Sequence, residues 1–180
     1  MKQPIEPTNR EVSLSEDEFI VSKTDTQSNI IYINRVFMQI SGFSERELLH
    51  LPHSIIRHPD MPRAVFHLLW QEIKAGREFL GYVKNICKDG GFYWVLAHVT
   101  PDWDENGKVI AYYSVRRRPT RTAVKYMTEL YAKMCAVEKA SPKERACEHA
   151  IKLLNETLAA QKISYFQLVQ QLDSEEDASR

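Results

Sequence analysis

The order of apolar and polar residues divides the chain near Arg118 into a strand-rich part and a helical part. Phe19–Lys23 and Ile30–Ile33 are short runs of β-branched and aromatic residues, and the residues between them are polar. Two such runs separated by turn-forming residues predict a β-hairpin. Residues 1–18 are polar and acidic, and we expect them to form an N-terminal arm with a short helical turn at residues 13–18.

Two short helices follow the predicted hairpin. Asn34 is a suitable N-cap for a helix that Gly42 ends, and Ser44 caps a second helix in which Glu47 completes a capping box. Each of these helices has about two turns or fewer.

A longer helix and three strands complete the first part of the chain. Apolar residues at spacings of three and four predict a helix from Met61 to Gly76. The turn-forming pair Asn106-Gly107 is a strong hairpin signal. The strand candidates are Phe79–Cys87, Phe92–Thr100 and Val109–Arg117.

This order of elements predicts an α+β fold: a five-stranded antiparallel sheet with short helices over one face. We expect residues 19–118 to form this domain. Helices inserted between the second and third strands leave a concavity over the sheet, where small molecules commonly bind. We therefore expect the functional site to lie between the helices and the sheet.

Residues 119–180 read as a helical extension of two helices and an acidic tail. The first helix covers the stripe up to Val137, and the second runs from Ser141 to Leu172 with a possible small break at Gln161-Lys162; the tail is Asp173–Asp177. Two amphipathic helices cannot bury their apolar stripes alone. They must pack on the sheet domain, on each other or on a second copy of the chain, and we expect a homodimer.

Composition and charge narrow the function classes. The 180 residues include 24 Lys and Arg and 24 Asp and Glu, so the formal net charge is zero. Without a basic excess we expect no nucleic-acid partner. No apolar stretch is long enough to span a bilayer, and we expect no membrane insertion by this chain. The three cysteines lie far apart and suggest neither a disulfide framework nor a zinc site, so we expect a cytoplasmic protein.

The densest polar cluster precedes the long helix. It contains His53, Arg57, His58 and Asp60, followed by Pro62. A planar guanidinium and the N–H groups that open a helix both favour a phosphate or pyrophosphate. The alternative is a structural loop in which Asp60 caps the helix and pairs with Arg57. Haem ligation by one of His53, His58 and His67 is a second alternative.

Other candidates lie on the long helix and the strands. Trp70 either seals the core or stacks on a planar ring. Asn85 alternates with Lys84 in a strand and shares a face with Val83, so we expect it to point inward, where its amide can donate to and accept from a ring. The run Arg116-Arg117-Arg118 reads as an exposed strand edge. No P-loop, nucleophile elbow or metal-binding helix motif is present, and we expect no enzymatic activity.

The same residues carry a family resemblance. Residues 19–118 resemble the PAS domains of bacterial aerotaxis receptors, which bind FAD. The resemblance rests on Thr24–Ser28, Ile33-Asn34, Ser41–Leu48, Pro52-His53, Arg57–Pro62, Trp70, Val83–Asn85, Gly90 and Tyr93–Val95. The segments Arg57–Pro62, Val83–Asn85 and Tyr93–Val95 are similar to the aerotaxis subgroup in particular. The resemblance implies a PAS fold that holds FAD noncovalently and passes its redox state to a signalling output.

The resemblance also implies roles for individual residues. The positions matching Arg57, His58 and Asp60 bind FAD in that family, and those matching Asn34, Trp70 and Asn85 hold or read the cofactor. His53, Tyr93 and Trp94 match as well. Light-sensing LOV domains use a cysteine in an Asn-Cys-Arg motif, which this sequence lacks.

The sequence therefore predicts an FAD-binding PAS sensor of redox, oxygen or energy state that reports through its C-terminal helices to an unidentified signalling protein. Aerotaxis receptors continue into a membrane anchor and a signalling domain, so we expect either a stand-alone sensor or a fragment of a longer receptor. The alternatives are a haem-binding PAS gas sensor and a cofactor-free PAS module for protein interaction or dimerisation.

Overall fold

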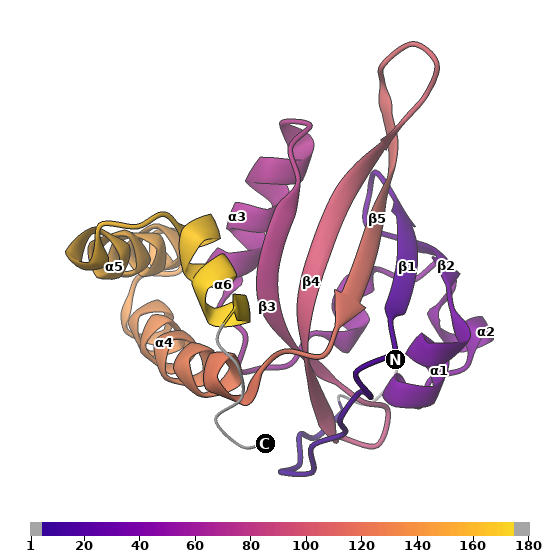
Figure 1. The fold of residues 1–180 in the computed structure, drawn as a ribbon, viewed down its shortest axis with the longest axis horizontal. Helices are drawn as coiled ribbons and strands as arrows, with labels where there is room; N and C mark the ends of the chain where they lie inside the picture. The colour runs from indigo at the N-terminus through magenta and orange to yellow at the C-terminus, as the bar shows by residue number, and fades with distance from the viewer. Residues whose placement is uncertain (1–4, 175–180) are drawn as a thin grey trace.

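The computed structural model describes residues 5–174, and a five-stranded antiparallel sheet is its centre (Figure 1). The strand order is β2-β1-β5-β4-β3, as predicted for an α+β fold. The first two strands form the predicted hairpin, and the last three pair in sequence order. The strands are β1 (Ile20–Asp25), β2 (Ile30–Ile33), β3 (Phe79–Ile86), β4 (Phe92–Trp103) and β5 (Val109–Arg117).

Short helices between β2 and β3 cover the inner face of the sheet. They are α1 (Arg35–Ser41), α2 (Glu45–Leu48), the 3₁₀ helix η1 (His53–Ile56) and α3 (Arg63–Lys74). The predicted caps are confirmed. The Asn34 side chain accepts from the Phe37 N–H, and Gly42 ends α1 at φ 73°; Ser44 and Glu47 form the capping box of α2. These local hydrogen bonds fix the ends of α1 and the start of α2.

Helix α3 differs because its N-cap, Pro62, offers no side-chain cap. The carboxylate of Glu138 replaces it from a distant part of the chain. This carboxylate accepts from the backbone N–H groups of Arg63, at 3.1 Å, and Ala64, at 2.8 Å. The C-terminal extension thus completes the helix that covers the sheet.

The extension contains three helices, not the two that the sequence pattern predicted: α4 (Arg121–Ala140), α5 (Ala146–Gln161) and α6 (Tyr165–Ser174). The chain breaks at the expected place, where Lys162 adopts a left-handed conformation at φ 56°. A new helix can start there because Ser164 and Gln167 cap it reciprocally. Residues 175–177 of the predicted acidic tail lie outside the described residues.

The extension packs on the β3 edge of the sheet and on α3 (Figure 1). Trp94 stacks on Tyr131 of α4 with ring centroids 6.1 Å apart. The Tyr131 hydroxyl donates to the Tyr82 carbonyl at 2.8 Å, and the Tyr82 hydroxyl donates to the Val169 carbonyl of α6 at 3.4 Å. Strands β3 and β4 are therefore held directly to two extension helices.

The helices of residues 5–174 include none that combines the length and apolar character needed to cross a membrane.

Candidate ligand-binding cavity

A cavity of about 100 Å³ lies between α3 and the inner face of the sheet. Its walls come from η1, the loop before α3, α3 itself and four strands. The lining residues are Ser22, Thr24, Ser28, His53, Ser54, Arg57, Phe66, Leu69, Trp70, Ile73, Val83, Asn85, Ala97, Val99, Tyr112, Ser114 and Arg116. A cavity thus lies where the order of elements predicted a concavity.

Asn85 is buried and lines the cavity, so the expectation that it points inward is confirmed. Its side-chain nitrogen, Nδ2, is buried without a hydrogen-bond partner in the protein. The loop before α3 runs beside it, because Arg57 forms a β-bridge with Asn85. A buried amide donor with no partner is costly, and its position at the cavity wall makes it available to a ligand.

Arg57 is half-buried and its guanidinium lies 3.7 Å from the centroid of the Phe66 ring. Its Nε is buried without a hydrogen-bond partner. Burial lowers the pKa of Arg57, while the nearby Glu138 carboxylate opposes that shift. The guanidinium therefore keeps its charge and offers an N–H to a group in the cavity.

Aromatic rings form one side of the cavity. Trp70 packs edge-to-face on Tyr112 with centroids 5.7 Å apart, and Phe66 lies one turn before Trp70 on α3. Trp70 is only partly buried, so it is not a core residue. The wall suits a planar aromatic ligand.

His53 lies between two polar neighbours at the floor of the cavity. Its Nε2 is 3.3 Å from the Ser22 hydroxyl and 2.7 Å from a guanidinium nitrogen of Arg116. Burial, and then the positive charges of Arg116 and Arg57, lower the pKa of His53 to about 3. His53 is therefore neutral near pH 7 and accepts a hydrogen bond from Arg116.

Arg116 corrects the sequence interpretation of the arginine run as an exposed edge. It is 4% exposed and lines the cavity. One guanidinium nitrogen, Nη2, donates to Ser22 at 2.6 Å, and the other, Nη1, has no hydrogen-bond partner. The signal was present in the strand alternation, which puts Arg116 on the same face as Tyr112 and Ser114.

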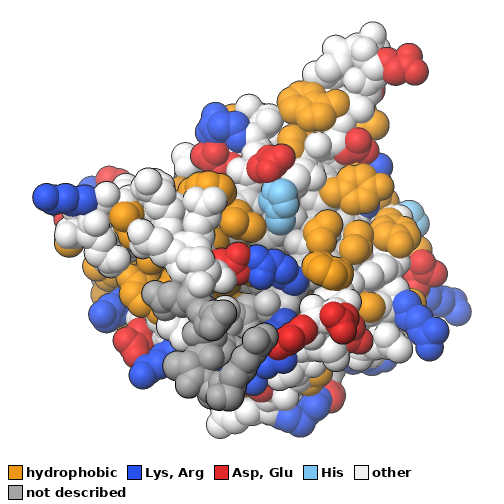
Figure 2. All heavy atoms as spheres, in the orientation of Figure 1, with side chains coloured by type: hydrophobic (Ala, Val, Ile, Leu, Met, Phe, Trp, Pro, Cys, Tyr) orange, Lys and Arg blue, Asp and Glu red, His pale blue; other side chains and the backbone are white. Residues whose placement is uncertain are grey.

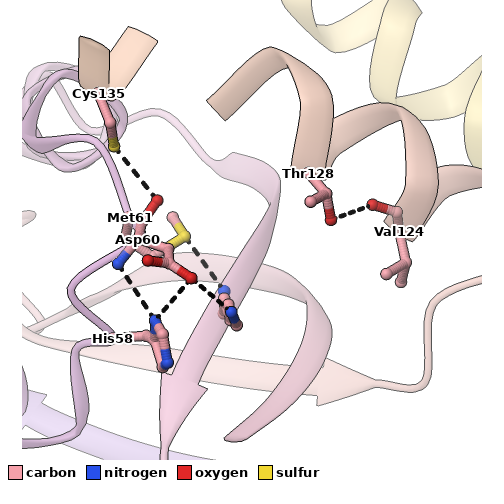
Figure 3. Close-up of polar contacts among 7 residues, drawn as sticks. His58, Asp60, Met61, Val124, Thr128 and Cys135 are labelled. Carbon is pink, nitrogen blue, oxygen red and sulfur yellow. Dashed lines mark hydrogen bonds and ion pairs between the residues drawn. The ribbon is translucent and has the colours of Figure 1, made fainter. Parts of the chain in front are cut away.

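His58 and Asp60 lie beside the cavity rather than in its wall. The His58 Nδ1 accepts from the Asp60 N–H at 3.1 Å, and Asp60 pairs with Lys84 at 2.6 Å. The alternative in which Asp60 caps the helix and pairs with Arg57 is therefore wrong. Figure 3 shows Asp60 between His58 and Cys135 of α4, whose thiol donates to the Asp60 carbonyl at 3.3 Å. These residues hold the loop that carries Arg57.

The structure also places Asn34, Tyr93 and Trp94 outside the cavity lining. The Asn34 side-chain amide is bonded to the backbone, since it accepts from the N–H groups of Val21 and Phe37 and donates to the carbonyl of Phe19. Tyr93 is buried on the inner face opposite Asn85 in the β3–β4 register, and burial raises its pKa. Trp94 points to the other face, toward α4.

Within the described part of the chain, His, Cys, Asp and Glu side chains form no group of three suited to a metal ion. The lining residues include two arginines and no acidic residue. The cavity can therefore hold a planar ligand that stacks on aromatic rings and presents acceptors or negative charge to Asn85, Arg57 and Arg116.

Fold and cavity together define a sensory domain of the PAS class. Residues 30–116 match the sequence model of the family described as PAS fold, and this segment is a PAS domain.

The chain is similar to part of an aerotaxis receptor. The chain is 40% identical over 124 residues, 69% of its length, to the aerotaxis receptor of Escherichia coli strain K12, and it spans 24% of the length of that receptor.

Solved structures with this fold include light-sensing LOV domains. The light-state structure of the aureochrome 1 LOV blue-light photoreceptor matches with a TM-score of 0.56 at 20% identity, over 64% of this chain and 91% of that one. A LOV domain whose mechanism was studied with a flavin analogue matches with a TM-score of 0.54 at 19% identity, over 62% and 83%. These likenesses agree with the PAS fold.

Proposed function

We propose that this chain is an FAD-binding PAS sensor that reports redox, oxygen or energy state through its C-terminal helices to a signalling partner. The observation that carries the proposal is the cavity itself, which is lined by aromatic side chains and by Asn85, Arg57 and Arg116, each with a buried donor that has no partner. The likeness to an aerotaxis receptor and to a LOV domain studied with a flavin analogue supports the same ligand class.

The residues present fit an isoalloxazine ring, which has polar edges and aromatic faces. Asn85 can bond the ring edge and Trp70 can stack on the ring. Arg57, at the loop, is placed for the diphosphate. Ligand sites commonly have about 300–1,000 Å³, so the cavity of about 100 Å³ must widen on binding. Outward movement of Trp70 and Arg57, which are only partly buried, provides this space.

FAD supplies one- or two-electron redox chemistry when bound. The chain's own part is to bind the ring, exclude water from it and relay a change in its hydrogen bonding. Asn85 lies on β3, whose Tyr82 carbonyl accepts from Tyr131 of α4. Glu138 and Cys135 link the same helix to α3 and to the loop that carries Arg57. A shift at the cavity is therefore transmitted to α4 along two routes.

The positions of the cysteines favour redox sensing over light-driven adduct formation. Cys87, Cys135 and Cys147 are the three cysteines of the chain, and none lines the cavity. Burial raises the pKa of the Cys87 thiol to about 11, and its thiol donates to the Ile40 carbonyl. Without a reactive thiol at the ring, cysteine-adduct photochemistry has no support in this chain.

We propose that the partner contacts include a second copy of the chain. Hydrophobic side chains gather on the outer face of the sheet over β5, β1 and β2, which the helices leave uncovered (Figure 2). Tyr32 and Tyr113 both lie opposite Lys23 in the strand register, and Val115 follows two residues after Tyr113. All three are between 39% and 47% exposed. Light scattering over a range of concentrations tests the dimer, and we expect the sensor to act in the cytoplasm without catalysing a reaction.

The deciding experiment is the absorption spectrum of the purified chain, followed by acid release and chromatography of the chromophore. FAD in near-stoichiometric amount supports the proposal. A Soret band from haem, or a colourless protein that does not take up added FAD, would refute it. The first of these results would indicate a gas sensor, and the second an interaction module.

A further inference from the structure

We propose that Arg116 is the ligand-binding group at the floor of the cavity and that it takes the acceptor edge of a planar heteroaromatic ring, here the carbonyl edge of an isoalloxazine. This inference rests on the proposed FAD binding and deepens it, because no sequence pattern had assigned Arg116 to the site. The structure brings it there from the end of β5.

The first argument is the missing counter-charge. Arg116 is 4% exposed, and among the residues that the structure describes no carboxylate forms an ion pair with it. Its neighbours include the Ser22 hydroxyl, the neutral His53 and the Phe37 ring, 5.3 Å away. The buried Tyr93 hydroxyl also lies near enough to act on its charge. A buried guanidinium is normally paired, because removing it from water is expensive. Burial accordingly lowers the pKa of Arg116 to about 10, which still leaves it charged at pH 7.

The second argument is the unpartnered donor of the guanidinium. Ser22 and His53 both accept from the Nη2 nitrogen of Arg116, while Nη1 is buried without a partner. Ser22, His53 and Arg116 all line the cavity. The two neighbours thus hold the guanidinium in place, and a ligand in the cavity satisfies the remaining N–H groups.

The third argument separates a ring edge from a phosphate. The cavity lining near the sheet also includes the apolar side chains of Val83, Ala97 and Val99. A multiply charged diphosphate loses too much hydration in such a floor, whereas a carbonyl edge loses little. Arg57 is half-buried in the loop and suits the diphosphate better. The two arginines therefore divide the ligand between them.

The test measures the stability of the ligand-free protein, which Arg116→Met should raise, and its affinity for the ring, which the same substitution should lower. In the full chain freed of ligand, Arg116→Met removes an unpaired buried charge and raises the urea midpoint of unfolding. In the same variant, affinity for added riboflavin, which has the ring but no phosphate, falls about 10- to 100-fold, the size expected for a charge-assisted hydrogen bond. Affinity for FAD falls by the same factor.

Two controls locate the effect. Arg117 is the next residue, points to the opposite face and pairs with Asp173, so Arg117→Met leaves both affinities unchanged. Arg57→Gln weakens FAD more than riboflavin, because the phosphates are absent from riboflavin.

Three results would overturn the inference. A lower urea midpoint for Arg116→Met without ligand would indicate a structural arginine. An unchanged riboflavin affinity would remove Arg116 from the ring site. A loss confined to FAD would make Arg116 the phosphate group. If the unmodified chain binds neither compound, the proposed function itself fails, and this is seen before any variant is compared.

Discussion

Glu138 offers the sharpest test of how the extension supports the cavity, because it caps the first turn of α3 from 74 and 75 residues away in sequence. The Glu138 side chain is 9% exposed and accepts from two N–H groups of the first turn of α3. We predict that Glu138→Ala destabilises the protein and frays the start of α3, which carries Phe66 and Trp70.

The magnitude follows from two contributions. Loss of an N-cap acceptor costs typically ~1 kcal/mol. Loss of a negative charge at a partly buried helix N-terminus costs about another 1 kcal/mol. Glu138→Ala should therefore lower the free energy of unfolding by about 2 kcal/mol, or the melting temperature by about 4–8 °C for a chain of this length. Glu138→Gln keeps an acceptor and should cost about half as much.

Urea unfolding measures the loss, and hydrogen exchange of the Arg63 and Ala64 amides locates it. Glu129→Ala is the matched control, since Glu129 is an exposed residue of the same helix, and it should change stability by less than about 0.5 kcal/mol. Equal losses in Glu138→Ala and Glu129→Ala would refute the capping argument. So would a loss in Glu138→Ala with unchanged exchange at Arg63 and Ala64.

The remaining predictions address the ligand, the pH dependence and the N-terminal arm. Asn85→Ser should weaken FAD binding about tenfold in a fluorescence titration, and unchanged affinity would remove Asn85 from the ring site. His53 has a pKa lowered to about 3 in the folded chain, so its contribution to stability is present above pH ~6.5 and is lost as pH falls. When the pH falls from 7.5 to 5, the free energy of unfolding measured in urea should drop by about 2 kcal/mol more for the unmodified protein than for His53→Gln. Equal drops in the two proteins would contradict a buried neutral imidazole. A Cβ at Gly90 would lie 2.2 Å from the Glu6 carbonyl oxygen, and the φ of Gly90 is 87°, so Gly90→Ala should displace the N-terminal arm and speed its proteolysis. Gly107→Ala is the control, because Gly107 has a similar φ of 75° but nothing near its Cβ position. Equal proteolysis rates in the two variants would count against the close approach at Gly90.

Most of the fold was predictable because its signals are local. Asn34, Gly42 and the Ser44–Glu47 capping box act within a few residues of their own positions, and the structure confirms each of them. The third extension helix was missed although its cap, Ser164 with Gln167, is of the same kind. The apolar stripe continues past the break, so periodicity alone joined two helices into one.

The candidate site was only partly predictable. Asn85 was placed inward correctly, because strand alternation needs no knowledge of other strands. His58 and Asp60 are close to Arg57 in sequence, yet the loop turns them toward Lys84 and α4 instead of the cavity. Arg116 reads as a surface charge, because the solvent exposure of a strand residue depends on what covers its face.

Taken alone, the order of apolar runs, caps and turns determined the α+β arrangement, the position of the cavity and the inward direction of Asn85. Each of these follows from periodicity or from groups a few residues apart, which act in any context that keeps the local conformation. Only the tertiary structure decided that Glu138 caps α3, that His53 is neutral and that Arg116 is buried without a counter-charge. Those properties depend on groups 60 or more residues apart and on the exclusion of water between them, and desolvation is a property of the assembled core rather than of any segment.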